Sequence, residues 1–275
     1  MTTATNSDLA YLRAIVLNHS NNVLEPERDY LFQTRLSVLL RDQGITQLTE
    51  LVQRLRSGKN PQLERAIAEA MTINETSFFR DSRPFELLRR ELLPKLIEAR
   101  RFTRRLRIWS AACSTGQEAL SVAMLLREYF TMQAGWDIRI EGTDIASSVI
   151  RRARQGCYHR IEINRGLPAR CIVRYFEKVD EDWVAKPEIH DLCHFRQENL
   201  CSTPPFRDIF DVILLRNVML YFSQETRCRV LETMHRLLAS DGVLLLGSAE
   251  QPANPTLWTP IVSGGTCYFR PASRC

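Results

Sequence analysis

Apolar positions in the first 80 residues recur at spacings of three and four, the period at which an α-helix buries one face. Helix starts are predicted at Ser7 or Asp8, near Pro26, at Thr46 and at Asn60, because Ser, Asp, Thr and Asn cap helix N-termini and Pro fits the first turn. The connections between these segments are short. The pattern therefore predicts an all-α helical bundle at the N-terminus.

From residue 105 the pattern changes to short apolar runs that alternate with amphipathic segments of helical spacing. The predicted strands are LRIWSAA, DIRIEGTDI, FDVILLRN and GVLLLGS. This alternation is typical of an α/β fold with a doubly wound, Rossmann-like parallel sheet. Near the C-terminus, residues 258–262 and 266–269 flank Ser263-Gly264-Gly265, which predicts an antiparallel hairpin.

Two interruptions of these patterns set the expected domain organisation. Residues 155–197 break the strand–helix alternation with Gly, Pro and mixed charge, which predicts a small inserted subdomain. A polar stretch, residues 74–81, separates the helical pattern from the α/β pattern. We therefore expect a helical domain with an interdomain segment in residues 1–82 and an α/β domain in residues 83–275.

The composition is that of a globular protein, since 44% of the 275 residues are hydrophobic and 25% are charged. No apolar run approaches the ~20 residues that span a bilayer, and no cationic start precedes an apolar stretch at the N-terminus. These features predict a cytoplasmic protein without membrane insertion. The eight cysteines include no CxxC pair and no zinc-ligand spacing, so free thiols and no metal are expected.

The net charge of +5 is concentrated in one segment. Residues 81–110 contain 9 basic and 4 acidic side chains, whereas the rest of the chain is balanced. This segment has two interpretations. Its arginines form a docking patch for an acidic partner, with Arg100, Arg101 and Arg104 as the residues to test, or they pair with acidic side chains of the same helix.

Polar residues follow three of the predicted strands. In open α/β sheets, ligands bind beyond the carboxyl ends of the strands. The first strand runs into the small, polar sequence ACSTGQE, which ends at Glu118 and lacks the GxGxxG pattern of a dinucleotide site. The second strand ends at Asp144, which either accepts ribose hydroxyls or caps the following helix. The strand FDVILLRN ends at Asn217 and is followed by Tyr221.

Five segments in order, spread over most of the chain, resemble the chemotaxis receptor methyltransferase family. They are MTINETSFFRD, WSAACSTGQEALSVAM, IEGTDIASSVIRRARQGCY, FRQENL and ILLRNVMLYF. The resemblance implies an enzyme that uses S-adenosyl-L-methionine to esterify glutamates on receptor coiled coils and releases S-adenosyl-L-homocysteine. It also implies a methyltransferase domain in residues 83–275, with the insertion at about 155–197 corresponding to the small β-subdomain of the family.

The resemblance further implies roles for individual residues. Arg80 and Tyr221 would be the catalytic residues beside the transferred methyl group. The residues implied to bind the cofactor are Asn74, Thr76, Arg80, Glu118, Asp144, Asn199, Leu200, Asn217 and Val218. The implied partner is the acidic helical bundle of a chemoreceptor, and neither nucleic acid binding nor oligomerisation is expected.

The sequence departs from the family pattern in two places. The second N-terminal helix carries Arg28, Arg35 and Arg41, but it also contains acidic residues. The insertion lacks the glycine-rich turn of members that bind a receptor tail. Two alternatives stay open: a methyltransferase for another substrate, such as nucleic acid, and a non-enzymatic signalling module of the same fold. A methyltransferase for nucleic acid would be expected to have a Pro-Pro-aromatic turn after Asn217, which binds an exocyclic amine. The sequence has no prolines there, which argues against this alternative.

Overall fold

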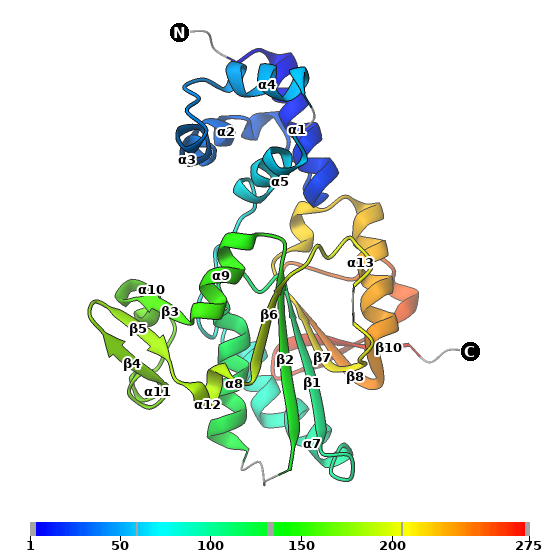
Figure 1. The fold of residues 1–275 in the computed structure, drawn as a ribbon. Coiled ribbons are helices and arrows are strands. Elements are labelled where there is room, and N and C mark those ends of the chain that lie inside the picture. The colour runs from blue at the N-terminus through cyan, green and yellow to red at the C-terminus, as the bar shows by residue number, and fades with distance from the viewer. Residues whose placement is uncertain (1–3, 59, 131–134, 205, 273–275) are drawn as a thin grey trace. The chain divides into compact units, whose positions relative to one another are not determined.

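The computed structural model describes residues 4–58, 60–130, 135–204 and 206–272 (Figure 1). The chain divides into two compact units. The first comprises Met1–Ile73 with Leu220–Thr226, and the second comprises Asn74–Met219 with Arg227–Cys275. Within the described residues, no helix combines the length and the apolar character needed to cross a membrane.

The first unit is the helical bundle that the apolar spacing predicts. Its elements are α1 (Asn6–Ser20), η1 (Pro26–Arg28), α2 (Tyr30–Arg35), α3 (Ser37–Asp42), α4 (Leu48–Ser57) and α5 (Pro61–Ala70). The buried side chains of Leu12, Phe32 and Leu51 come from three different helices of the unit and belong to one core. The bundle therefore stabilises itself through burial rather than through helix propensity alone.

Helix boundaries in this unit follow the capping chemistry, with three corrections. The helix predicted to start at Thr46 begins at Leu48, with Gln47 at its N-cap and no side-chain cap. Asn60 caps α5 as predicted, because its side chain accepts from the Leu63 N–H. The first helix is capped by Thr5 instead of Ser7 or Asp8, and Asp8 completes the capping box. The single helix expected after Pro26 is divided at Leu36 into α2 and α3.

The second unit contains the doubly wound sheet, which confirms the predicted fold class. Its strands are β1 (Arg105–Ala111), β2 (Asp137–Asp144), β6 (Cys193–Gln197), β7 (Phe210–Leu215), β8 (Leu238–Leu246), β9 (Trp258–Ser263) and β10 (Thr266–Pro271). Their order is β6-β2-β1-β7-β8-β10-β9. The first five are parallel, and β10 is antiparallel to both β8 and β9. The carboxyl ends of the parallel strands therefore meet at one edge.

Helices connect the parallel strands. They are α6 (Arg83–Leu87), the π-helical turn η2 (Leu88–Leu92) and α7 (Leu93–Ala99) before β1, α8 (Gln117–Tyr129) and α9 (Ser147–Gln155) around β2, and α13 (Gln224–Leu237) before β8. The crossover through α8 leads from β1 to β2, toward one end of the strand order (Figure 1). The crossover through α13 leads from β7 to β8, toward the other end. Since such crossovers are right-handed, α8 and α13 cover opposite faces of the sheet.

A small sheet lies within the expected insertion. It consists of β3 (Cys157–His159), β4 (Phe176–Val179) and β5 (Asp182–Ala185) in the order β3-β5-β4, with the short helices α10 (Arg160–Asn164), α11 (Ala169–Tyr175) and α12 (Pro187–His190). The last residues of the expected insertion form β6, which pairs with β2 in the main sheet. The subdomain also packs closely on the 74–81 stretch: a Cβ on Gly166, whose φ is +97°, would lie 2.1 Å from the Phe78 carbonyl oxygen.

The C-terminal hairpin has the geometry that its glycines predict. Gly264 and Gly265 join β9 to β10 and have φ values of +56° and +73°. A two-residue turn with two positive φ values matches the right-handed twist of the flanking strands. Residues with a Cβ adopt this conformation only with strain, so the Gly-Gly pair fixes the register of the hairpin.

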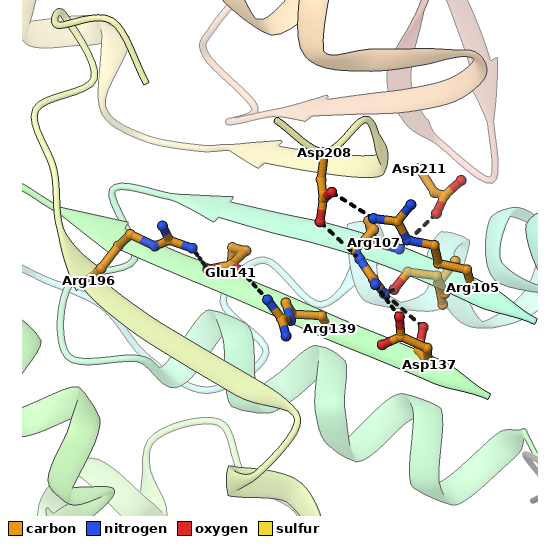
Figure 2. Close-up of polar contacts among 9 residues, drawn as sticks. Arg105, Arg107, Asp137, Arg139, Glu141, Arg196, Asp208 and Asp211 are labelled. Carbon is orange, nitrogen blue, oxygen red and sulfur yellow. Dashed lines mark hydrogen bonds and ion pairs between the residues drawn. The ribbon is translucent and has the colours of Figure 1, made fainter. Parts of the chain in front are cut away.

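A network of ion pairs lies at the amino-terminal ends of β1, β2 and β7 (Figure 2). Asp208 accepts from Arg105 at 2.7 Å and from Arg107 at 3.3 Å, and Arg107 also pairs with Asp137. The Arg107 side chain is 6% exposed, so its charge requires these partners. Further along β2, buried Glu141 pairs with Arg196 at 2.7 Å.

The charge surplus of residues 81–110 is largely absorbed by such pairs. Arg100 donates to Asp211 at 2.7 Å and to both oxygens of Asp241 at 2.9 and 2.6 Å, and Arg101 pairs with Glu98. Arg101 therefore pairs locally, as the second interpretation expects. Arg100 is also paired, but its partners lie on β7 and β8 and not on its own helix. Burial raises the pKa of Asp211, although Arg107 and Arg100 counteract it, whereas the Arg100 hydrogen bond lowers the pKa of Asp241.

Candidate functional site

The loop after β1 approaches the end of β2 through its backbone. Ser114 has a φ of +51° and Gly116 a φ of +93°, so this loop departs from extended strand geometry at both residues. The Ser114 N–H donates to Asp144 at 2.9 Å, and the Ser114 hydroxyl donates to the Asn74 carbonyl at 2.7 Å. One serine thus connects the β1 loop to the β2 end and to the 74–81 stretch.

Asp144 is a buried carboxylate whose two oxygens each accept a backbone N–H. One binds Ser114 and the other binds Ala146 at 3.0 Å. The following helix starts at Ser147 with Ala146 at its N-cap, so the alternative in which Asp144 caps that helix is wrong. Because each carboxylate oxygen has two acceptor positions, a carboxylate at this strand end can accept hydroxyls as well as backbone N–H groups.

Glu118, in the first turn of α8, is held from two sides. The Ser110 hydroxyl donates to its Oε1 at 2.7 Å, and Arg216 donates to its Oε2 at 2.9 Å. Arg216 follows β7 and its side chain is 2% exposed. Its second terminal nitrogen donates to the Arg80 carbonyl at 2.8 Å and to Asp81 at 2.9 Å. Arg216 therefore joins the candidate residues Glu118 and Arg80 to the end of β7.

The 74–81 stretch is folded back on itself. Nη1 of Arg80 donates to the Glu75 carbonyl at 2.8 Å. Asn74 and Thr76 line a cavity of about 420 Å³ together with Thr115 and Gln117, which flank the start of α8. Asn74 and Thr76, both predicted from the resemblance, thus lie beside the loop that follows β1, whereas Arg80 contacts Glu75 and Arg216.

The end of β7 is organised by a carboxylate from the loop after β8. Asn217 has a φ of +60°, an uncommon value for a residue with a side chain. Its N–H and that of Gly247 each donate to Glu250 Oε2 at 2.8 Å, and the Met219 N–H donates to Oε1 at 2.8 Å. Half-buried Val218 lies between two of these anchored residues. Glu250 therefore fixes the backbone at two predicted cofactor-binding positions.

The segment after β6 is tied to the end of β2. The Glu198 N–H donates to the Asp144 carbonyl at 2.9 Å, and the side chain of Asn199 accepts from the Cys201 N–H at 2.9 Å. Leu200 is half-buried. Asn199 and Leu200 therefore follow directly on a backbone contact with Asp144.

Tyr221 lies in the first unit, whereas the other predicted site residues lie in the second. It ends η3 (Met219–Tyr221), and its carbonyl accepts from the Val23 N–H at 2.8 Å. The pairing of Arg80 with Tyr221 as catalytic residues stays a prediction.

The thiol of Cys113, in the loop after β1, is not activated as a nucleophile. Burial, followed by the nearby Asp144 and Glu118 carboxylates, raises the pKa of Cys113 well above its ordinary value. The nucleophilic form of cysteine is the thiolate, and a raised pKa disfavours it at neutral pH.

These contacts define what the second unit can bind. A carboxylate in the first turn of α8 and another at the end of β2 suit a ligand with ribose hydroxyls and a cationic group, and the small residues of the β1 loop allow close approach to the backbone. S-adenosyl-L-methionine has both features, so the residues present fit this cofactor. Sequence reasoning missed Arg216 and Glu250, although Arg216 lies inside one of the quoted segments.

Comparison with known proteins agrees with this geometry. The family model described as CheR methyltransferase, SAM binding domain matches residues 74–266, and the CheR methyltransferase, all-alpha domain model matches residues 7–72. Chemotaxis protein methyltransferase 1 of Pseudomonas aeruginosa is 38% identical over 251 residues, which are 90% of this chain and 91% of the relative. Chemotaxis protein methyltransferase Cher2 of Pseudomonas putida is 35% identical over 249 residues, 89% and 90% of the two chains.

The fold, the site and these matches define the protein as an S-adenosyl-L-methionine-dependent methyltransferase. The helical unit and the α/β unit each correspond to one of the two matched domain models. The chain belongs to the CheR methyltransferase family, which confirms the resemblance found in the sequence.

Proposed function

We propose that the protein transfers the methyl group of S-adenosyl-L-methionine to glutamate side chains in the cytoplasmic domains of chemoreceptors. The products are glutamate methyl esters and S-adenosyl-L-homocysteine, and the enzyme works as a cytoplasmic monomer. The names of its relatives support the chemotaxis context. The observation that carries the proposal is the Arg216 contact, which joins the Glu118 carboxylate to the Arg80 backbone at the carboxyl end of the sheet.

The chemistry of the proposed reaction needs no general base. A glutamate side chain has a reference pKa of about 4.3 and is ionised at neutral pH. The bound cofactor supplies a methyl group already activated by a sulfonium. The protein therefore has to desolvate, align and hold the attacking carboxylate. A protonated Cys113 is compatible with this scheme, because no cysteine nucleophile is used.

We assign the residues as follows. Arg80 orients the substrate carboxylate through its guanidinium, and the Tyr221 hydroxyl donates to the other carboxylate oxygen. Glu118 holds the cationic amino group of the cofactor, and Asp144 accepts its ribose hydroxyls. Asn74 and Thr76 contact the methionine part, whereas the adenine end is framed by Asn199, Leu200, Asn217 and Val218.

The direct test is transfer of radiolabelled methyl from S-adenosyl-L-methionine to purified receptor cytoplasmic fragments. The label should be released by mild base, as an ester is, and should disappear when the target glutamates are replaced by alanine. Base-stable label would contradict ester formation. Calorimetry with S-adenosyl-L-homocysteine provides the matching binding measurement, and the absence of binding heat would contradict the cofactor assignment.

A further inference from the structure

A second cavity, of about 810 Å³, opens in the second unit beside the predicted catalytic segment. Its walls come from Asp81 to Pro84, from the loop after β8, and from the β9–β10 hairpin. Trp258, Pro260 and Phe269 supply an apolar, rigid surface on the hairpin side. A cavity of this size and lining is typical of a ligand-binding site.

The charged side chains that line this cavity differ in whether they already have a partner. Asp81 is bound to Arg216 at 2.9 Å, and Glu250 accepts three backbone N–H groups. Arg83 lines the same cavity and forms no ion pair with any residue in the described ranges of the chain. Its Nη1 lies 3.9 Å from the position of a Cβ built on Gly265, which places the guanidinium next to the hairpin turn.

Arg83 also carries part of the positive charge of residues 81–110 that no ion pair neutralises within the described chain. Most of the basic side chains in that segment pair with carboxylates, as Arg89, Lys95 and Arg105 do. Of the nine, Arg83 and Arg104 form no ion pair within the parts of the chain that the structure describes. Arg104 immediately precedes β1, at the amino-terminal end of the sheet, whereas the cavity borders the loop after β8 at the carboxyl end.

We propose that this cavity is the subsite for the receptor residues that flank the target glutamate. The inference rests on the proposed function. A flanking apolar side chain packs against Trp258, Pro260 and Phe269, and a flanking carboxylate pairs with Arg83. The position supports this occupant, because the lining starts at Asp81, one residue after Arg80. A substrate carboxylate held at Arg80 therefore brings its neighbouring residues to this wall.

Charge complementarity supports the same occupant. A peptide segment that presents glutamate to the enzyme is acidic by nature, and a rim cation that is not already paired contributes to its capture. The apolar wall adds a preference for one hydrophobic neighbour in that segment. The subsite thus selects among glutamates by what stands beside them, rather than by the carboxylate itself.

The test measures methyl transfer to a receptor cytoplasmic fragment with the full-length enzyme and two cavity variants. Arg83→Glu reverses the rim charge, and Cys267→Trp fills the cavity from an exposed position on β10. Each should raise the KM for the receptor fragment by about threefold to tenfold, the range expected when an exposed charged pair or an apolar contact is lost. The affinity for S-adenosyl-L-homocysteine, measured by calorimetry, should stay unchanged and shows that each variant is folded.

Arg104→Glu is the matched control, because Arg104 also lacks an ion pair within the described residues but lies at the other end of the sheet. It should leave the KM for the receptor unchanged. An unchanged KM in both cavity variants, with wild-type transfer intact, would overturn the subsite and leave the proposed function standing. A wild-type enzyme that transfers no methyl to receptor fragments would overturn the proposed function itself. An equal rise in KM for Arg104→Glu would also overturn the subsite, since the effect would be general electrostatics.

Discussion

Arg216 donates to Glu118 at 2.9 Å across 98 positions of the sequence, and the Arg216 side chain is 2% exposed. The same guanidinium binds Asp81 and the Arg80 carbonyl. A planar guanidinium can serve three acceptors in fixed directions, whereas an ammonium cannot replace that geometry. The contact therefore aligns two ends of the candidate site with one side chain.

Replacing Arg216 with Met should cost about 3 kcal/mol of unfolding free energy, because it leaves Glu118 without its buried cationic partner. Urea unfolding measures the change. Arg90→Met is the control, since Arg90 is 73% exposed and pairs only on the surface with Glu86. Equal losses for the two variants would contradict the role given to Arg216.

Removing the Glu250 carboxylate should destabilise the end of β7. Glu250→Ala leaves the N–H groups of Asn217, Met219 and Gly247 without their acceptor, which is expected to cost about 3 kcal/mol or more. Glu250→Gln keeps one amide oxygen and should lose less. Thermal unfolding ranks the variants, and an equal Tm for both would show that the acceptor is not the important feature.

Asp144→Ala should weaken binding of S-adenosyl-L-homocysteine by about 1–3 kcal/mol if the carboxylate accepts the ribose hydroxyls. Calorimetry gives the affinity directly. Because Asp144 also holds the Ser114 and Ala146 N–H groups, the unfolding free energy is measured on the same variant. Lower stability with unchanged affinity would restrict Asp144 to an internal structural role.

Arg80→Ala should abolish methyl transfer while cofactor binding is retained at least in part. The Arg80 side chain donates to the Glu75 carbonyl, whereas Arg216 binds the Arg80 backbone, which alanine preserves. The segment is therefore expected to keep its position. Single-turnover transfer of labelled methyl separates the chemical step from binding, and wild-type turnover would refute the catalytic role.

Acid should weaken the network at the amino-terminal ends of the strands. The Arg100 hydrogen bond lowers the pKa of Asp241 below its ordinary 3.8, so the ionised form is favoured in the folded state. This contribution is present above about pH 4 and is lost as the pH falls through the lowered folded value. In the Asp241→Asn variant, the unfolding free energy should therefore decrease less between about pH 5 and pH 3 than it does in the wild type.

Asp211 belongs to the same network but has the opposite effect on the pH dependence of stability. Burial raises its pKa, so its contribution to stability decreases as the pH rises from 3.8 through the higher folded value. Asp211→Asn should consequently make the loss of stability in acid steeper. Urea unfolding at several pH values compares the two variants, and slopes that change in the same direction would contradict these assignments.

Local chemistry made most of the fold predictable. The Asn60 cap, the Gly264-Gly265 turn and the alternation of apolar strands with helices all act over a few residues, where sequence is directly informative. The carboxyl-end position of Asp144 followed from the same reasoning. The division of the second helix at Leu36 has no comparable signal in the sequence.

Long-range partners were the part that sequence could not supply. Arg100 looked like an exposed residue of a basic helix, but its partners Asp211 and Asp241 lie 111 and 141 positions away. The same holds for Arg216 and Glu250, whose side chains act on segments that only the folded sheet brings together. A single sequence shows which residues carry charge, but it does not show which charges meet.

The close approach of Gly166 to the Phe78 carbonyl has a consequence for protein engineering. A side chain at position 166 would have its Cβ 2.1 Å from that oxygen, so this point tolerates only hydrogen. Exchange of the inserted subdomain between relatives, as a way to alter receptor preference, would thus succeed only with donors that keep glycine there. The contact between Gly166 and Phe78 therefore limits which chimeras can fold, and this limit cannot be seen from the subdomain or from the rest of the protein alone.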